Sequence, residues 1–242
     1  TQKGSSKLSA TLLALILGAS VFMAGQVWAA KYVTDPTNGK VVTAPEYGGT
    51  LTYGASFEPP NSDAMIGGIG AGSAASGVVE KLGIANWGID RSVNNLANEF
   101  LLEDHFTGAL AERWDIPNPS TYIFHIRQGV RWHDKAPMNG RELTASDVEF
   151  NYHRMLGLGS GFSEASAHAG QYPKVASVTA TGASTVVFKL AEPDLLWQLK
   201  PVPAYGGLTG LLNMWIAFIY PPEVIKQHGD VQDWRNLVGT GP

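Results

Sequence analysis

Apolar and polar residues alternate most clearly in the stretch TYIFHIR, residues 121–127. Its side chains divide into two faces, Tyr122, Phe124 and Ile126 on one and Ile123, His125 and Arg127 on the other. A period of two predicts a β-strand. We expect a turn at Gln128-Gly129, after which Val130 to Trp132 returns beside this strand.

Similar alternation marks two later segments, KVASVTATG and STVVFKLAEP, which predict two strands joined as a hairpin at Gly182-Ala183. A period near 3.6 appears instead in LTASDVEFNYHRML, residues 143–156. Thr144 is a suitable N-cap and Asp147 completes a capping-box-like start. The predicted buried face of this helix consists of Val148, Tyr152, Met155 and Leu156. Gly157 is expected to end the helix.

A further short helix is predicted to open at Pro221-Pro222. Strands and helices are thus mixed, without the strict alternation of a simple doubly wound sheet. The pattern predicts an α/β fold.

The first 29 residues resemble a secretory signal peptide. Lys3 and Lys7 precede a long uncharged apolar run that ends in Val27-Trp28-Ala29, with cleavage expected after Ala29 or Ala30. The run is also long enough for a retained membrane anchor, so this alternative stays open. In either case we expect the folded part outside the cytoplasm, after a polar, extended linker at residues 30–46.

Gly68, Gly70 and Gly72 have a spacing that hints at a dinucleotide-binding loop. Such a loop needs a buried strand before it, and PPNSDAM cannot form one. The segment is therefore expected to be a flexible loop of small residues.

Composition excludes several function classes. The formal charge is -4 and no Lys/Arg run forms a phosphate-binding stripe, so we expect no nucleic-acid partner. The chain contains no cysteine, which excludes disulfides, thiolate metal sites and a cysteine nucleophile.

Residues that could carry chemistry are present but do not form a catalytic pattern. None of the six histidines lies in an HExxH or similar metal motif. His133 and Asp134 are adjacent at the end of a strand and would point to opposite faces, so we interpret them as turn residues. GLGSG, residues 157–161, has the G-x-S-x-G spacing shifted out of register, and follows a helix rather than a strand. We therefore expect no enzyme activity, no metal and no cofactor.

Tryptophans are the other candidates, because they can line a ligand cleft or fill the core. Six lie beyond the predicted signal: Trp87, Trp114, Trp132, Trp197, Trp215 and Trp234.

Six stretches occur in an order that resembles a known family. They are GGTLTYG, LAERWDI, TYIFHIRQGVRWHD, LTASDVEFNYHRML, TVVFKL and DWRNLVGTGP, between about Tyr47 and Pro242. This order is similar to that of the family 5 extracellular solute-binding proteins, the oligopeptide and dipeptide periplasmic binding proteins of ABC importers. The resemblance implies a two-lobed periplasmic-binding-protein type II-like α/β fold.

Within that fold, residues 47–242 would be the N-terminal part of the solute-binding domain, comprising the first lobe and an added subdomain at about residues 65–180. The chain begins with Thr1 rather than Met and stops in a turn-like sequence, so we expect an N-terminal fragment. It departs from the family pattern in an extra loop around Asn139-Gly140 and in the loop at residues 67–77. These departures leave the ligand class open.

The resemblance also implies a function: a monomeric periplasmic protein that captures peptides by hinge closure and delivers them to a membrane permease. Ser56, Phe57 and Glu58 are the expected cleft-facing residues, and Glu58 could pair with the amino terminus of a ligand. Nickel chelates, haem, opines or oligosaccharides are alternative ligands within the family. A membrane-anchored sensory or structural ectodomain is the alternative from another class.

Overall fold

The computed structural model describes residues 31–35, 39–44, 48, 50, 52, 58–93, 105–172, 174–193 and 216–241. The chain divides into two compact units, Thr1–Thr52 and Tyr53–Pro242. In the first unit, strands β1 (Tyr32–Thr34) and β2 (Val41–Thr43) form an exposed antiparallel hairpin, with Val33 opposite Val42. The predicted linker thus contains two extended segments that pair, a pairing the sequence pattern does not predict.

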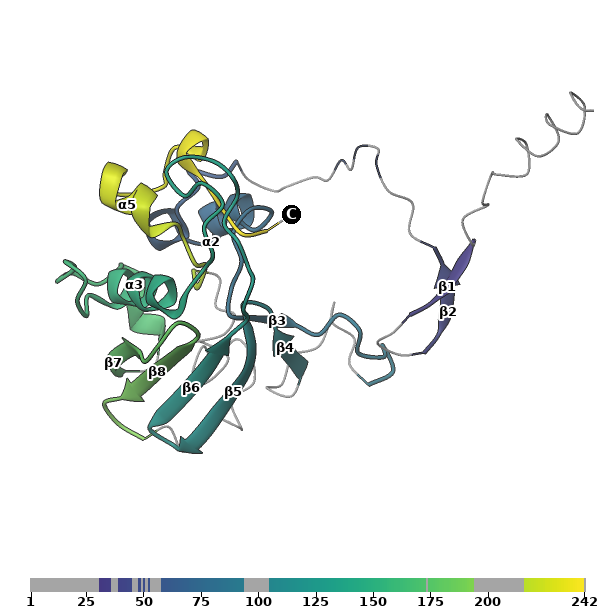
Figure 1. The fold of residues 1–242 in the computed structure, drawn as a ribbon, viewed down its shortest axis with the longest axis horizontal. Coiled ribbons are helices and arrows are strands. Elements are labelled where there is room, and N and C mark those ends of the chain that lie inside the picture. The colour runs from purple at the N-terminus through teal and green to yellow at the C-terminus, as the bar shows by residue number, and fades with distance from the viewer. Residues whose placement is uncertain are drawn as a thin grey trace, which may run out of the picture. The chain divides into compact units, whose positions relative to one another are not determined.

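The second unit is built on a four-stranded antiparallel sheet with the order β5-β6-β8-β7 (Figure 1). The strands are β5 (Ala111–Asn118), β6 (Thr121–Ile126), β7 (Val175–Ala180) and β8 (Thr185–Leu190). The predictions of the strand at 121–127 and of the later hairpin are therefore confirmed. Two short strands, β3 (Gly83–Ala85) and β4 (Phe106–Gly108), form a separate antiparallel pair.

Helix α3 (Ala145–Leu156) packs against β7 and β8, and α5 (Pro222–His228) contacts α3 (Figure 1). The predicted caps are confirmed, because the Thr144 N–H donates to Asp147 Oδ2 at 2.9 Å and Gly157 adopts a left-handed conformation with φ 68°. A left-handed C-cap suits glycine, which has no Cβ to clash. The start of α5 at Pro222 is as expected, since proline is favoured in the first turn of a helix.

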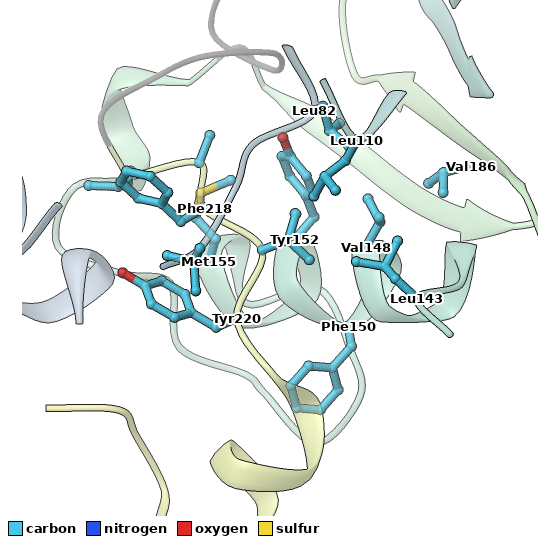
Figure 2. Packing of buried hydrophobic residues seen from close by; sticks show 14 of the residues in the cluster. Leu82, Leu110, Leu143, Val148, Phe150, Tyr152, Met155, Val186, Phe218 and Tyr220 are labelled. Atoms are coloured by element: carbon cyan, nitrogen blue, oxygen red, sulfur yellow. The ribbon is translucent and has the colours of Figure 1, made fainter. Parts of the chain in front are cut away.

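The core fills the space between α3 and the sheet and continues to Leu82 and to Phe218 and Tyr220, which precede α5 (Figure 2). Phe188 of β8 is fully buried at its centre, with its ring centroid 5.2 Å from that of Phe124 and 4.7 Å from that of Tyr152. Both pairs are edge-to-face, the arrangement that aromatic quadrupoles favour. The apolar faces predicted for β6 and α3 thus meet around one aromatic ring.

The expected return of Val130 to Trp132 beside β6 is wrong. The neighbours of β6 are β5 and β8. Residues 130–132 pair with residues 141–143 instead: the Trp132 N–H donates to the Arg141 carbonyl at 3.0 Å and the Leu143 N–H to the Val130 carbonyl at 2.8 Å. This path buries Trp132 in the core. The stabilisation from that burial depends on residues distant in sequence, so a local alternation pattern does not predict it.

The glycine-rich segment is also not the flexible loop that we expected. It forms helix α2 (Ala64–Ala75), broken at Gly68, where φ is 66° and ψ is -148°. Small residues allow close approach here: a Cβ added to Gly67 would lie 2.7 Å from Asn61 Oδ1 and 2.8 Å from Ala71 Cβ. Tight packing therefore outweighs the low helix propensity of glycine.

Arg141 joins the start of α3 to α5. Its guanidinium donates to Asp147 Oδ1 and Oδ2 at 2.7 and 2.8 Å, and to Glu223 Oε1 and Oε2 at 2.6 and 2.8 Å. Burial alone would raise the pKa of Glu223, but the hydrogen bonds and charge of Arg141 lower it below its ordinary value of 4.5. Arg141 thus holds two carboxylates that would otherwise repel each other.

The predicted signal peptide, residues 1–29, lies outside the described residues. Within the described ranges, no helix has the length and apolar character to cross a bilayer. The signal peptide remains a prediction.

Replacing Phe188 by Ala tests the core. We expect Phe188→Ala to lower the free energy of unfolding by about 3–5 kcal/mol, because it leaves a cavity between two rings. Trp234→Ala is the control, since Trp234 is 67% exposed and its loss should cost under about 0.5 kcal/mol. Urea unfolding followed by circular dichroism measures both. Equal effects of the two changes would contradict this placement of the core.

Glu223 should make the stability of the folded chain depend on pH in the acid range. Its folded pKa lies below its unfolded value, so its stabilising contribution is present above pH 4.5 and is lost as the pH falls through the folded pKa. Unfolding free energies measured between pH 3 and pH 6 should therefore fall less steeply toward acid in Glu223→Gln than in the wild type. Glu192→Gln, which removes an exposed carboxylate, should retain the wild-type slope. An unchanged slope in Glu223→Gln would refute the role of this pair.

Candidate functional site

A buried ion pair fixes the segment that enters α2. Asp63 is fully buried, and its Oδ2 lies 2.5 Å from Nη2 of Arg154, near the end of α3. The same carboxylate accepts the N–H groups of Met65 at 3.1 Å and Val231 at 3.2 Å. A buried charge is tolerated only when paired and hydrogen-bonded. Asp63 therefore ties together α2, α3 and the chain after α5.

Tyr220 provides a second anchor for the same segment (Figure 2). Its hydroxyl accepts the Ala64 N–H at 2.8 Å and donates to the Ser62 carbonyl at 3.2 Å. Asn151 of α3 holds the Tyr220 backbone in turn, with its Nδ2 donating to the Tyr220 carbonyl at 2.7 Å and its Oδ1 accepting the Tyr220 N–H at 2.9 Å. Burial raises the pKa of Tyr220, so its hydroxyl keeps the proton that it donates. The entry into α2 is thus held rigidly.

The break in α2 presents an apolar surface at the end of this rigid entry. Ile66 is 49% exposed and Ile69 is 62% exposed, one on each side of the break. Gly68 itself is buried and Gly67 is half-buried. An interruption of the helical hydrogen-bond ladder leaves backbone N–H and C=O groups that need other partners. Here the Ile66 and Gly67 N–H groups donate to the Asp63 carbonyl at 3.0 and 2.7 Å, and the two isoleucine side chains lie exposed on either side of the break.

The residues predicted to face the ligand lie just before this surface in the chain. Ser56 and Phe57 fall outside the described residues. Glu58 is exposed and precedes Pro59-Pro60. Ile66 and Ile69 are not among the residues predicted to face the ligand, because their segment was predicted to be a loop. An isoleucine on each side of a Gly-Gly pair was the available signal for a broken helix.

Asp134 lies at a bend, and His133 directly precedes it. His133 is half-buried, and its Nε2 lies 2.7 Å from the Gly241 carbonyl oxygen, while its backbone N–H donates to the Gly239 carbonyl at 2.8 Å. Gly239 packs so closely that an added Cβ would overlap the Val78 carbonyl oxygen. His133 thus anchors the C-terminal segment.

The described residues contain no cluster of three or more His, Cys, Asp or Glu side chains placed to hold a metal ion. His153 Nδ1 lies 2.8 Å from Ser160 Oγ, and its Nε2 lies 2.9 Å from the Val178 carbonyl oxygen. The carbonyl requires a proton on Nε2, so Nδ1 accepts from the serine. This pair ties the loop after α3 to β7.

Solved structures with the same arrangement are periplasmic binding proteins. The DppA protein of Helicobacter pylori, solved with the peptide STSA, has a TM-score of 0.53 and is 22% identical; the match covers 76% of this chain and 34% of that one. A dipeptide-binding protein of Pseudoalteromonas sp. SM9913, solved with Met-Leu, has a TM-score of 0.55 and is 18% identical, over 78% of this chain and 35% of that one. The fold is therefore that of part of a periplasmic binding protein.

Sequence comparison gives the family. The model of the bacterial extracellular solute-binding proteins, family 5 (Middle) matches residues 105–242, more than half of the chain. This chain belongs to that family. It is 34% identical over 142 residues to the dipeptide-binding protein of Escherichia coli K12, a match that covers 55% of this chain and 25% of that protein. The match thus spans about a quarter of the relative's length, and such relatives are binding proteins rather than enzymes.

Removing one partner of the buried pair tests its role. We expect Arg154→Met to lower the unfolding free energy by about 3–5 kcal/mol, because it leaves the Asp63 charge buried and unpaired. Lys174→Met is the matched control: it breaks an exposed pair with Glu192 and should cost less than about 1 kcal/mol. Adding Asp63→Asn to Arg154→Met should recover part of the loss. If the two single variants were equally stable, Asp63 would not be the junction described above.

Proposed function

We propose that this chain is part of the periplasmic substrate-binding component of an ABC importer, and that the component captures peptides. Membership of family 5 and the similarity to the E. coli dipeptide-binding protein support the class of protein. The observation that carries the ligand class is the break in α2, where two exposed isoleucines flank an interrupted backbone.

Extended peptides suit such a surface. Their main-chain amides can pair with backbone groups at Ile66–Ile69, as in other modes of peptide recognition by main-chain hydrogen bonds. Their apolar side chains can cover Ile66 and Ile69, which removes apolar area from water at roughly 25 cal/mol per Å². The surface would thus bind peptides largely irrespective of sequence.

The remaining steps follow from the class. Ligand would stabilise a closed arrangement of two lobes, and a membrane permease would bind that closed form. The protein would act as a monomer in the periplasm after removal of residues 1–29. Residues 47–242 would supply the first lobe, with the added subdomain at about residues 65–180.

Ser56, Phe57 and Glu58 complete the proposed peptide site. They precede the anchored segment at Asn61 to Asp63 by only a few residues and the break at Gly68 by ten to twelve, and Glu58 carries an exposed carboxylate. A carboxylate at this position can bind the ammonium group at the start of a peptide.

Glu58→Gln should weaken binding of the dipeptide Met-Leu to the full-length protein by about tenfold or more, because a hydrogen bond to a charged group contributes about 1.5–3 kcal/mol. Isothermal titration calorimetry measures the affinity. Glu164→Gln, another exposed carboxylate, is the control and should bind as the wild type does.

N-acetyl-Met-Leu lacks the ammonium group and isolates the contact. Its affinity should be the same for wild type and Glu58→Gln. If Met-Leu bound both proteins equally well, Glu58 would have no role at the amino terminus. If Met-Leu, Ala-Phe and Gly-Gly-Leu all failed to bind the wild type, the assignment to peptides would be overturned.

A further inference from the structure

A serine and a histidine meet where the loop after α3 turns back. Ser160 Oγ lies 2.8 Å from Nδ1 of His153, and Nε2 of the same ring lies 2.9 Å from the Val178 carbonyl oxygen of β7. The carbonyl can only accept, so in the neutral ring Nε2 carries the proton and the lone pair of Nδ1 faces the serine hydroxyl. A histidine in this tautomer can take the proton of Ser160 as a general base. The arrangement thus provides a nucleophile, its base and a backbone acceptor that orients the base.

The backbone of the turn holds Ser160 against His153. Ser160 has φ 52° and Gly161 has φ 90°, and the Phe162 N–H donates to the Gly159 carbonyl at 2.9 Å, which closes a tight turn. Gly159 lies against the imidazole, since a Cβ added there would be 3.2 Å from His153 Nδ1. Serine rarely adopts a positive φ, and such exceptions concentrate at functional sites. Glycine or asparagine would adopt this φ more easily, so the backbone alone does not explain a serine here.

Ser160 is exposed at the wall of a hollow between the start of α3 and α5. The volume of the hollow is about 270 Å³, slightly smaller than the sites of drug-sized ligands. Phe150 forms its apolar wall beside α5 (Figure 2), with its ring centroid 5.3 Å from that of Phe162 in the turn. A small acyl ester can therefore reach the Ser160 hydroxyl.

The charges around the hollow favour a neutral ester over an anionic one. Its lining includes two cationic side chains and three carboxylates, those of Arg141, Lys226, Asp147, Glu149 and Glu223. Arg141 is bound by two of the carboxylates, Asp147 and Glu223. Its charge is therefore already matched and does not attract an anionic substrate.

We infer that Ser160 is a reactive serine that small, neutral, activated esters acylate, with His153 as its base. Ser160 Oγ attacks the acyl carbon and forms a new ester bond, while its proton passes to His153 Nδ1. The bond between the acyl carbon and the leaving oxygen breaks with its electron pair. The leaving oxygen, or water, then takes the proton from Nδ1. The products are an ester of Ser160 and a free alcohol or phenol.

The test is the reaction of the full-length protein with p-nitrophenyl acetate at neutral pH. Absorbance follows the release of p-nitrophenolate, and peptide mapping by mass spectrometry after acid quenching locates the acetyl group. We expect acetyl-Ser160 in the wild type. Ser160→Gly removes the hydroxyl at a φ that glycine adopts easily, so it should give the wild-type circular dichroism spectrum and lose the fast phase of release.

Two further variants separate the base from the surroundings. His153→Gln removes the base, so acetylation of Ser160 should slow at least about a hundredfold, because general base catalysis contributes about 10²–10⁴-fold. Ser146→Ala is the matched control: Ser146 is also exposed at the hollow, but the imidazole of His153 is bonded to Ser160 instead. It should leave the acetylation of Ser160 unchanged.

Three outcomes would overturn the inference: acetyl groups only on lysines or on His153, equal acetylation of Ser146 and Ser160 in the wild type, or unchanged acetylation of Ser160 in folded His153→Gln. The inference does not depend on the proposed peptide function, because it uses no residue of the Ile66–Ile69 surface. Absence of Met-Leu binding would overturn only the peptide proposal.

Discussion

The pairing of Asp63 with Arg154 is the interaction on which the arrangement of this chain depends. The two residues are 91 positions apart, and both side chains are almost completely removed from water. Since an unpaired carboxylate at this depth costs several kcal/mol, the start of α2 and the end of α3 must meet. The Val231 N–H completes the shell of the same carboxylate, so the chain after α5 is fixed at the same point. One charge thus determines how three segments far apart in the sequence come together.

The surface that we propose for peptides is carried by an element attached to this junction. It lies at Ile66–Ile69, three to six residues beyond Asp63. The sheet and α3 supply the rigid support, and Tyr220 and Asn151 transmit it through buried hydrogen bonds. Sites built on rigid elements keep their geometry, which lowers the entropic cost of binding. The sheet and α3 therefore affect binding at the proposed surface although they are not part of it.

Much of the supporting structure could be predicted from the sequence because its signals are local. The alternation at residues 121–127, the caps of α3 at Thr144 and Gly157, and the hairpin at Gly182-Ala183 each lie within a few residues. The errors arose where tertiary contacts decide. Gly67 packs closely against Asn61 and Ala71 within α2, Gly68 breaks the helix, and Trp132 lies away from β6 because its burial is favourable. The site residues proposed from the sequence end at Glu58. Ile66 and Ile69 were missed because their exposure depends on a broken helix that local sequence does not predict.

Hydrogen–deuterium exchange of the full-length protein with and without Met-Leu tests the central claim most directly, because it shows where a peptide contacts the chain. The account predicts that saturating Met-Leu slows exchange of the backbone amides at residues 66–69, where the helical ladder of α2 is broken. Exchange in β7 and β8, which support the structure without contacting the ligand, should not change. Saturable binding of Met-Leu with no protection at residues 66–69 would contradict the assignment of the α2 break as the peptide surface.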